Sequence, residues 1–489
     1  MTRTFNTRLV IKTMGALLLI EAVFMLMPSL VCLIYREKEL NAFCFSTALT
    51  MLTGIIGLLV GRRAEKHVGA REGYLIVAIV WIVFSLFGML PYYLSGAIPD
   101  FTDAFFETMS GFTTTGATVI PDVESMGHGI LFWRSLTQWL GGMGIIVLSI
   151  AILPMFGMGG MQLYAAEVTG LSYEKVSPRI SDTAKLIWTL YLCLTLCEVL
   201  LLWLFGMDFF DSVCHSLSTM ATGGFSTKNN SLAYYDNAAI HYTVTVFMLV
   251  AGINFVLLIY LLRGKPKHLL KDEETRWYVG CALLCALLVF AGLYITRPSW
   301  TWQTAERSFR DGLFTVISSM TSTGYTISDY VLWHPVLWVL ILFLMLTGGC
   351  AGSTAGGIKW VRLVIIIKNA VTEFKRRIHP NAVIPVKLNG KPVGQQSINN
   401  TMAFMLLYMF IIGVTTLVFC ACGVNFEESL GTAISAMGNV GISVGQFGPA
   451  GTYASFPIVG KWVMTMVMLI GRLEIFTILL LFSPTLWKK

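Results

Sequence analysis

Four segments of the chain carry the same residue types at the same spacing. In each, an acidic residue stands two positions after a phenylalanine, a serine follows seven positions later, and a glycine follows six positions after the serine. The phenylalanines are Phe101, Phe209, Phe309 and Phe426; the acids Asp103, Asp211, Asp311 and Glu428; the serines Ser110, Ser218, Ser318 and Ser435; the glycines Gly116, Gly224, Gly324 and Gly441. Agreement at four registers indicates an internal repeat.

The residues next to each glycine are suited to binding a cation through oxygen atoms. These loops offer backbone carbonyls, and glycine permits a backbone conformation in which successive carbonyls point the same way. Four such loops around one axis would form rings of oxygens that replace the hydration shell of an ion. The candidate cation-binding residues are Thr114, Thr115, Gly116, Thr222, Gly223, Gly224, Ser322, Thr323, Gly324, Asn439, Val440 and Gly441.

The spacing also predicts the element that positions each loop. The acid and the serine lie about two helical turns apart, so each segment is expected to form a short helix of roughly 10 residues. The acid then lies at the N-terminus, where a carboxylate caps free amides and offsets the positive end of the helix dipole. An irregular loop inside a membrane is tolerated only where it lines a cavity. Four purely structural re-entrant hairpins are the alternative.

Composition places the chain in a membrane. Hydrophobic residues make up 55% and charged residues 12% of the 489 residues, against ~25% charged residues in soluble proteins. Many apolar runs exceed the roughly 20 residues that cross a bilayer as a helix. Ten crossings are expected, at 10–35, 41–61, 74–97, 132–155, 186–206, 239–262, 277–296, 335–358 (interrupted), 399–421 and 462–484.

Each repeat is therefore expected to contain an outer crossing, a short pore helix, a loop and an inner crossing. The predicted fold class is an all-α integral membrane protein with four M1–pore helix–M2 repeats in a pseudo-fourfold arrangement. The first two crossings lack the repeat and form an extra N-terminal pair of transmembrane helices. The expected boundaries are 1–70 for this pair and 71–180, 181–270, 271–390 and 391–489 for the four repeats.

The basic residues predict the orientation. The formal net charge is +7, but the lysines and arginines fall mostly in short segments between crossings, so no nucleic-acid partner is expected. Ten crossings place both termini on one side, and this side holds most of the basic residues, which makes it cytoplasmic. Its basic segments 263–276 and 359–391 are either docking faces for a partner or ordinary positive-inside loops.

One inner crossing is interrupted and has charged residues nearby. Its five glycines are poor helix formers and favour an irregular loop, although close helix packing through small residues is the alternative. Arg472 lies in the last apolar span, where an ionisable residue is functional by default; a pair with Glu474 or snorkelling is the alternative. The candidate gate residues are Gly348, Gly349, Gly352, Gly356, Gly357, Lys359 and Arg472.

The repeat, the extra N-terminal pair and the segment WRSLTQWLGGMGIIVL from Trp133 carry a family resemblance. The chain resembles the Trk/Ktr/HKT superfamily of potassium transporters over essentially its whole length, and is most similar to the bacterial TrkH/TrkG-type uptake proteins. The resemblance implies that potassium is the substrate and that one glycine in each loop marks potassium selectivity. The second loop reads Thr222–Gly223–Gly224 and the fourth Asn439–Val440–Gly441, so the filter departs from fourfold symmetry and its selectivity is expected to be less strict.

The same resemblance implies a mechanism and partners. The interrupted helix matches the intramembrane gating loop of the family, the membrane part is a homodimer surrounded by membrane lipids, and a cytosolic nucleotide-binding TrkA-type protein regulates it. The location implied is the bacterial inner membrane, and no covalently bound cofactor is expected. The family contains both passive channels and cation-coupled symporters, and the sequence leaves open a proton- or sodium-coupled symporter.

A membrane enzyme and a receptor or scaffold are the competing classes. An enzyme would need a cluster such as HExxH or a nucleophile beside its base, and the seven histidines form no such cluster. A receptor or scaffold would not need four carbonyl-rich re-entrant loops. The sequence therefore predicts a transporter and no enzymatic activity.

Overall fold

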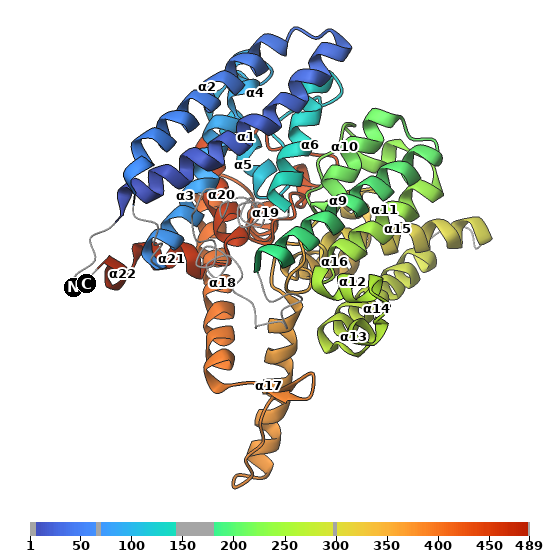
Figure 1. Ribbon diagram of the computed structural model, residues 1–489. Coiled ribbons are helices and arrows are strands. Elements are labelled where there is room, and N and C mark those ends of the chain that lie inside the picture. Colours follow the sequence, from blue (N-terminus) through green and yellow to red (C-terminus); the bar gives the residue numbers. More distant parts are fainter. Residues whose placement is uncertain (1–5, 65–69, 143–179, 297–300, 488–489) are drawn as a thin grey trace.

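The computed structural model describes residues 6–64, 70–142, 180–296 and 301–487. The described chain is mostly helical, with one small antiparallel hairpin of β1 (Lys387–Leu388) and β2 (Lys391–Pro392). Helices α1 (Thr7–Tyr35) and α2 (Leu40–Val60) pack against each other along their lengths at one side of the molecule (Figure 1). They form the expected N-terminal pair.

A long helix, a helix with a buried C-terminal part and a further helix recur in this order four times. The long helices are α3 (Ala70–Gly88), α9 (Ile180–Leu204), α14 (Glu273–Thr296) and α18 (Gln395–Ala421). The pore helices are α5 (Phe101–Phe112), α10 (Phe209–Met220), α15 (Trp302–Met320) and α19 (Phe426–Gly438). The inner helices begin with α6 (His128–Gly142), α11 (Ala238–Ala251), α16 (Pro335–Leu346) and α20 (Ile458–Arg472). The predicted helical fold class is confirmed, while the residue boundaries of the repeats stay a prediction.

Short elements connect and extend these helices. The α-helical ones are α4 (Leu90–Ser95), α12 (Phe255–Leu262), α13 (Pro266–Lys271), α17 (Trp360–Ile378), α21 (Phe476–Phe482) and α22 (Pro484–Trp487). The 3₁₀ turns are η1 (Gly61–Arg63), η3 (Ser231–Tyr234), η4 (Tyr330–Leu332) and η5 (Gly445–Phe447). Figure 1 shows α17 extending below the rest of the helices.

The ten expected crossings are only partly reproduced. Six described helices are long and apolar enough to cross a membrane, or up to eight if each of two bent pairs counts as one span. The crossings expected at 239–262 and 462–484 are each a bent pair of helices, because α11–α12 bends by 106° and α20–α21 by 114°; whether each pair crosses as one broken span stays a prediction. Residues 143–155 of the crossing expected at 132–155 lie outside the described residues. The interruption expected within 335–358 is present, since α16 ends at Leu346.

The bend between α11 and α12 is stabilised by the interrupted helix. Breaking a membrane helix frees backbone groups that need new partners. Asn254 supplies one, because its side chain accepts a hydrogen bond from the Val256 N–H at 2.8 Å. The Gly252 carbonyl accepts from Cys350 at 2.8 Å, and the Phe255 N–H donates to Gly352 at 3.1 Å. The two helix breaks therefore satisfy each other.

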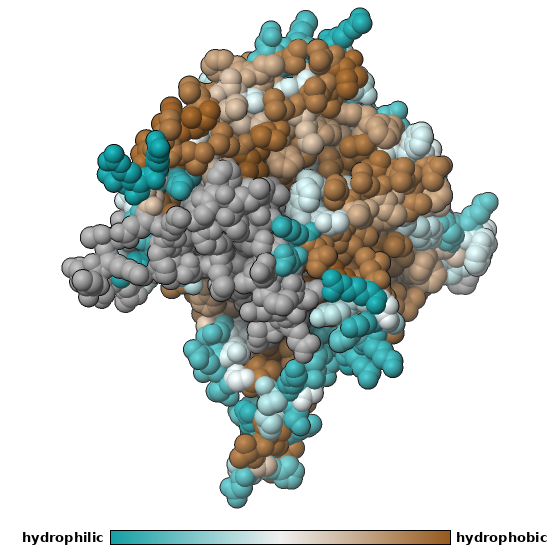
Figure 2. Space-filling model, in the orientation of Figure 1, coloured by the Kyte–Doolittle hydropathy of each residue, from teal (hydrophilic) through white to brown (hydrophobic). Residues whose placement is uncertain are grey.

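Hydrophobic side chains cover much of the outer surface. Figure 2 shows them over α1 and α2, while hydrophilic residues gather around α13 and along α17. On α1, Leu30 and Ile34 are 60% and 75% exposed. Exposed apolar residues on long helices are stable against lipid tails, which agrees with a multi-pass membrane protein.

Candidate cation-binding filter and the loop beside it

The four predicted filter loops adopt one backbone conformation. The first filter residue of each loop has a positive φ although it carries a side chain, at 55° for Thr114, 54° for Thr222, 55° for Ser322 and 55° for Asn439. The four glycines have φ of 79° at Gly116, 77° at Gly224, 81° at Gly324 and 89° at Gly441. This left-handed region is open to glycine and uncommon for other residues. The repeat in the sequence is therefore a repeat in the backbone.

Each pore helix ends in the same hydrogen bond. The N–H of the middle filter residue donates to the carbonyl of the repeated serine at 2.9 Å in all four loops. The pairs are Thr115–Ser110, Gly223–Ser218, Thr323–Ser318 and Val440–Ser435. A hydrogen bond back to the last helical turn, combined with a left-handed residue, is a common way to end a helix. It turns each chain sharply from the pore helix into the filter.

The glycines also mark where neighbouring loops meet. A Cβ built on each glycine would overlap the carbonyl oxygen of the middle residue in the next loop. The distances are 2.0 Å from Gly116 to the Gly223 oxygen, 2.0 Å from Gly224 to Thr323, 2.0 Å from Gly324 to Val440 and 2.2 Å from Gly441 to Thr115. The order runs from the first loop to the fourth and back to the first, so the loops close a ring with carbonyl oxygens at each junction.

Side chains hold the loops in different ways. In the first and third loops, paired threonine hydroxyls lie 2.8 Å apart, between Thr113 and Thr115 and between Thr321 and Thr323. In the fourth loop, the Asn439 Nδ2 donates to the Thr115 Oγ1 at 3.0 Å and therefore ties the fourth loop to the first. The four loops thus share one backbone conformation, and the residues that differ between them make different side-chain contacts.

Helix α6 carries two filter contacts that sequence reasoning missed. Arg134 is 2% exposed and pairs with Glu107 of α5, with 2.8 Å between Nε and Oε1. Its other nitrogens donate to Thr118 and to the carbonyl of Ser226, which follow the first and second loops. Gln138, one helical turn later, contacts the second loop. The sequence contains a pattern that indicates these contacts: an arginine and a glutamine four residues apart in an apolar span lie on one face of a helix, and polar residues in such a span need polar partners.

Asp103, Asp211 and Glu428 lie in the first turn of their pore helices, as expected, but the predicted capping hydrogen bonds come from other residues. The caps precede these acids: Asp100 accepts from the Asp103 N–H at 3.0 Å, and Asp208 accepts from the Phe210 N–H at 2.9 Å. Helix α15 begins at Trp302 with a capping box at Thr301, so Asp311 lies well inside the helix rather than at its start. The acid-to-serine spacing identified the pore helices but placed the third N-terminus too late.

The acids instead connect the pore helices to other segments. Asp211 accepts from Thr227 at 2.7 Å and from Tyr235 at 2.5 Å, both of which follow the second filter loop. Asp103 pairs with Lys461 of α20 at 2.6 Å. Asp211 thus ties its pore helix to the chain after the second loop, and Asp103 ties its pore helix to α20.

The predicted gate segment is an irregular loop at 347–359 that contacts the filter. Its two ends are joined by hydrogen bonds, from the Gly348 N–H to the Ile358 carbonyl at 2.9 Å and from Ile358 to Leu346 at 3.1 Å. The loop touches the third filter loop, since the Gly356 N–H donates to the Ser322 Oγ at 2.7 Å. The predicted gate segment and the third filter loop are therefore in direct contact.

Arg472 joins this loop to the filter. Its Nη1 donates to the Thr114 Oγ1 at 3.1 Å and to the Thr354 carbonyl at 2.9 Å. Its Nη2 donates to the carbonyls of Gly141 and Gly142 at 2.5 and 2.8 Å. The structure thus brings the predicted gate arginine together with a filter residue and the gate loop. Lys359 bonds to the Ala355 carbonyl within the loop.

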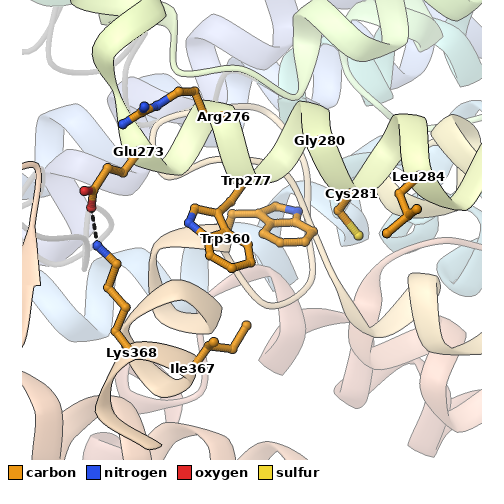
Figure 3. A pocket seen from close by; sticks show the side chains of 9 residues that line it. All are labelled: Glu273, Arg276, Trp277, Gly280, Cys281, Leu284, Trp360, Ile367 and Lys368. Atoms are coloured by element: carbon orange, nitrogen blue, oxygen red, sulfur yellow. Dashed lines mark hydrogen bonds and ion pairs between the residues drawn. The ribbon is translucent and has the colours of Figure 1, made fainter. Parts of the chain in front are cut away.

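A buried carboxylate anchors the other end of the gate loop. Glu274 is 1% exposed, and its Oε1 accepts from Ala351 at 2.7 Å and from Val361 at 3.0 Å. Next to it, α14 and α17 enclose a cleft of about 560 Å³ that contains two tryptophans, Trp277 and Trp360, with the Glu273–Lys368 ion pair at one end (Figure 3). The backbone N–H of Trp360 donates to the Gly349 carbonyl at 3.2 Å, so this cleft adjoins the base of the loop.

Comparison with known proteins identifies the family. The family model TrkH, described as a cation transport protein, matches residues 41–489. The chain belongs to the TrkH family. Proteins named Trk system potassium uptake protein TrkH are 38% identical in Salmonella typhimurium and 37% identical in Escherichia coli K12, each over 99% of both chains. The potassium uptake protein TrkG of Escherichia coli K12 is 32% identical over 99% of this chain.

A solved TrkH-family structure has the same fold. The crystal structure of the potassium transporter TrkH from Vibrio parahaemolyticus aligns with a TM-score of 0.88 at 36% identity, covering 99% of this chain and all of that one. The chain is therefore a multi-pass membrane transport protein and not an enzyme. Within the described ranges, no group of three or more His, Cys, Asp or Glu side chains could hold a metal ion.

Proposed function

We propose that this chain takes up potassium through the ring formed by its four filter loops. The observation that carries the proposal is the closed cycle of contacts, in which each loop glycine meets a carbonyl oxygen of the next loop. Rings of such oxygens can replace the hydration shell of a dehydrated cation. The relatives named as potassium uptake proteins favour potassium as that cation.

The gate in this proposal is the loop at 347–359 together with Arg472. The arginine places a positive charge between Thr114 of the filter and Thr354 of the loop. A positive charge in a medium of low dielectric constant repels a permeating cation strongly. The loop also contacts the third filter loop through Gly356. Movement of the loop with Arg472 would open the path, and the glycines and Lys359 belong to the same moving segment.

The proposal also covers assembly and a regulator that binds on the cytoplasmic side. The protein is proposed to lie in a bacterial inner membrane with both termini in the cytoplasm, as a homodimer with a cytosolic nucleotide-binding TrkA-type regulator. The basic segment 359–391 supports this arrangement, because α17 extends away from the other helices and carries Lys375, Arg376 and Arg377 in its last turn (Figure 1). A regulator bound there would act on the gate directly, since α17 begins immediately after the loop.

Ion flux in proteoliposomes tests this function. Purified chain should carry rubidium and potassium inward and should give a reversal potential that follows the potassium gradient. Sodium should carry less current under matched gradients. A parent chain that moves neither potassium nor rubidium would overturn the proposal.

A coupled symporter is the second candidate, and two buried carboxylates favour it. Glu21 of α1 and Glu198 of α9 have no exposed surface, and in the described part of the chain their oxygens have no hydrogen-bond partner. Ionisable groups within membrane helices often belong to proton relays. Under a pH gradient alone, a symporter would shift the reversal potential, and Glu198→Gln would abolish that shift; a passive channel would show neither effect.

A further inference from the structure

The second filter loop lacks a side chain where the other three loops have one. Its middle residue is Gly223, whereas the first, third and fourth loops have Thr115, Thr323 and Val440. The amide of Gln138 occupies the missing volume: a Cβ built on Gly223 would lie 2.4 Å from Gln138 Cδ and 2.6 Å from its Oε1. Gln138 is completely buried. Helix α6 therefore fills from outside the loop a space that the loop itself leaves empty.

The Gln138 amide also binds the loop backbone on both sides of Gly224. Its Nε2 donates to the Gly223 carbonyl at 2.6 Å, and its Oε1 accepts from the Phe225 N–H at 3.1 Å. If the amide were flipped, its oxygen would face the Gly223 carbonyl oxygen and its NH₂ group would face the Phe225 N–H. Only one orientation of the amide therefore satisfies both partners. One side chain thus fixes the peptide groups before and after the filter glycine.

The carbonyl that Gln138 binds belongs to the ring of junction oxygens. The Gly223 oxygen is the one nearest to a Cβ built on Gly116, so it lies where the first and second loops meet. Among the hydrogen bonds of the described residues, none reaches the matching carbonyls of Thr115, Thr323 and Val440. Three ring oxygens are thus free to face an ion, and the fourth is shared with an N–H donor.

We propose that Gln138 is a positioning and selectivity-determining residue of the filter. It holds the Gly223 oxygen in the ring and weakens the field that this oxygen offers to a cation, because a donor already occupies part of its electron density. Selectivity in such rings depends on the number and field strength of the oxygens. This inference rests on the proposed filter function and explains how a loop with two adjacent glycines keeps its shape.

Two sets of variants of the full chain, measured in proteoliposomes, test the inference. Gln138→Met keeps the side-chain length and removes both hydrogen bonds. The potassium-to-sodium permeability ratio, read from reversal potentials with potassium on one side and sodium on the other, should change roughly fivefold, the factor given by about one net hydrogen bond. Trp139→Phe is the matched control, because Trp139 donates to Thr195, on the α9 side rather than to the filter, and its ratio should equal that of the parent.

The second arm gives the loop its own side chain. Gly223→Thr alone should abolish selective conduction, because the new Cβ meets the Gln138 amide. Combining it with Gln138→Ala removes the obstacle and makes the loop resemble the first and third, so the ratio should return to within about twofold of the parent, a strongly non-additive result.

Three outcomes would overturn the inference. They are an unchanged ratio in Gln138→Met, a change of equal size in Trp139→Phe, and a double variant that conducts no more selectively than Gly223→Thr. A parent that conducts no potassium would instead overturn the proposed function itself. Should Gln138→Met fail to reach the membrane, the Gly223→Thr pair of variants decides the matter alone.

Discussion

The filter loops and the gate loop at 347–359 are both irregular backbone among membrane helices, but they are held in different ways. Each filter loop has the same hydrogen bond to its own pore helix and the same contact with its neighbour. The gate loop occurs once. Backbone hydrogen bonds join its two ends and tie it to the break between α11 and α12, and single side chains, above all Arg472 and Glu274, make its other contacts. Contacts made by single side chains can be broken at lower cost than a set of contacts repeated in four loops.

The ring and the gate loop should therefore control different properties of transport. Changes at the ring should alter which ion passes, because the ring sets the positions of the oxygens. Changes at Arg472 or Glu274 should alter how often ions pass, because these residues hold the loop and leave the ring intact.

The largest effect is expected from Gly116→Ser. The new Cβ would lie 2.0 Å from the Gly223 oxygen, so the first and second loops must separate and the ring opens. Potassium preference should be lost entirely in reversal-potential measurements. Gly96→Ser is the matched control, because Gly96 has a similar φ of 76° but no atom within 4 Å of the added Cβ. It shares the backbone strain of about 1–2 kcal/mol and should keep the preference; equal losses in both variants would contradict the ring.

Arg472→Ala should give the next largest effect, on flux rather than selectivity. The change removes hydrogen bonds to Thr114 and Thr354. Hydrogen bonds to charged groups stabilise by about 1.5–3 kcal/mol, which corresponds to roughly a tenfold to hundredfold shift toward the open loop. Rubidium uptake should rise accordingly and depend less on a cytosolic regulator, with the potassium preference unchanged. Deleting residues 350–355 should act in the same direction.

A matched arginine checks that prediction. Arg310 of α15 pairs with Glu306 one turn away and does not contact the described filter or gate loop. Arg310→Ala should leave uptake at the parental rate. If Arg472→Ala reaches the membrane and conducts no faster than Arg310→Ala, the loop is a packing element and the gate lies elsewhere.

Glu274→Gln should give a smaller rise in flux. The carboxylate accepts N–H bonds from Ala351 and Val361 at the base of the loop. The amide keeps one acceptor oxygen but loses the charge, so a cost of roughly 1 kcal/mol and about a fivefold change in flux are expected. Its neighbour Glu273 pairs with Lys368 instead, so Glu273→Gln serves as the control. An equal rise in both variants would show that general weakening of this region opens the pore.

The sequence predicted the four repeated loops and the glycine-rich interruption with Arg472, but it missed Gln138 and Glu274. The serine and glycine positions located all four filter loops, because the same backbone geometry imposes the same residues each time. Gln138 and Glu274 belong to no repeat, and each acts on a loop more than 70 residues away. Their partners come together only through packing. A single polar residue in an apolar span can be recognised in the sequence, but the sequence does not predict which residue it will contact.

The acids show a different limit. Their position near the helix start made a capping role the simplest interpretation, and the spacing alone could not show that Asp100 and Asp208, directly before the repeated phenylalanines, supply the caps. Asp311 shows the same limit more strongly, because α15 begins seven residues before Phe309. Periodicity identifies which residues share a helix better than it identifies where the helix begins.

The smallest predicted effect concerns the support of α6, the helix that carries Arg134 and Gln138. Glu37, in the turn between α1 and α2, accepts hydrogen bonds from the N–H groups of His128 and Gly129 at 2.6 and 2.9 Å and therefore caps this helix. Burial raises the pKa of Glu37, but these bonds and His128 outweigh burial, so the pKa lies below its ordinary value.

A lowered carboxyl pKa contributes stability above the unfolded pKa, and that stability is lost as the pH falls through the folded value. Glu37→Gln should therefore lower the melting temperature in detergent near neutral pH by a few degrees, in line with a cap of about 1 kcal/mol, and this difference from the parent should shrink as the pH is lowered below about 4.5. Glu39→Gln, in the same turn, is the control and should show no such trend. A Glu37→Gln variant that matches the parent at neutral pH would show that α6, and with it the grip on the second filter loop, does not depend on the N-terminal pair.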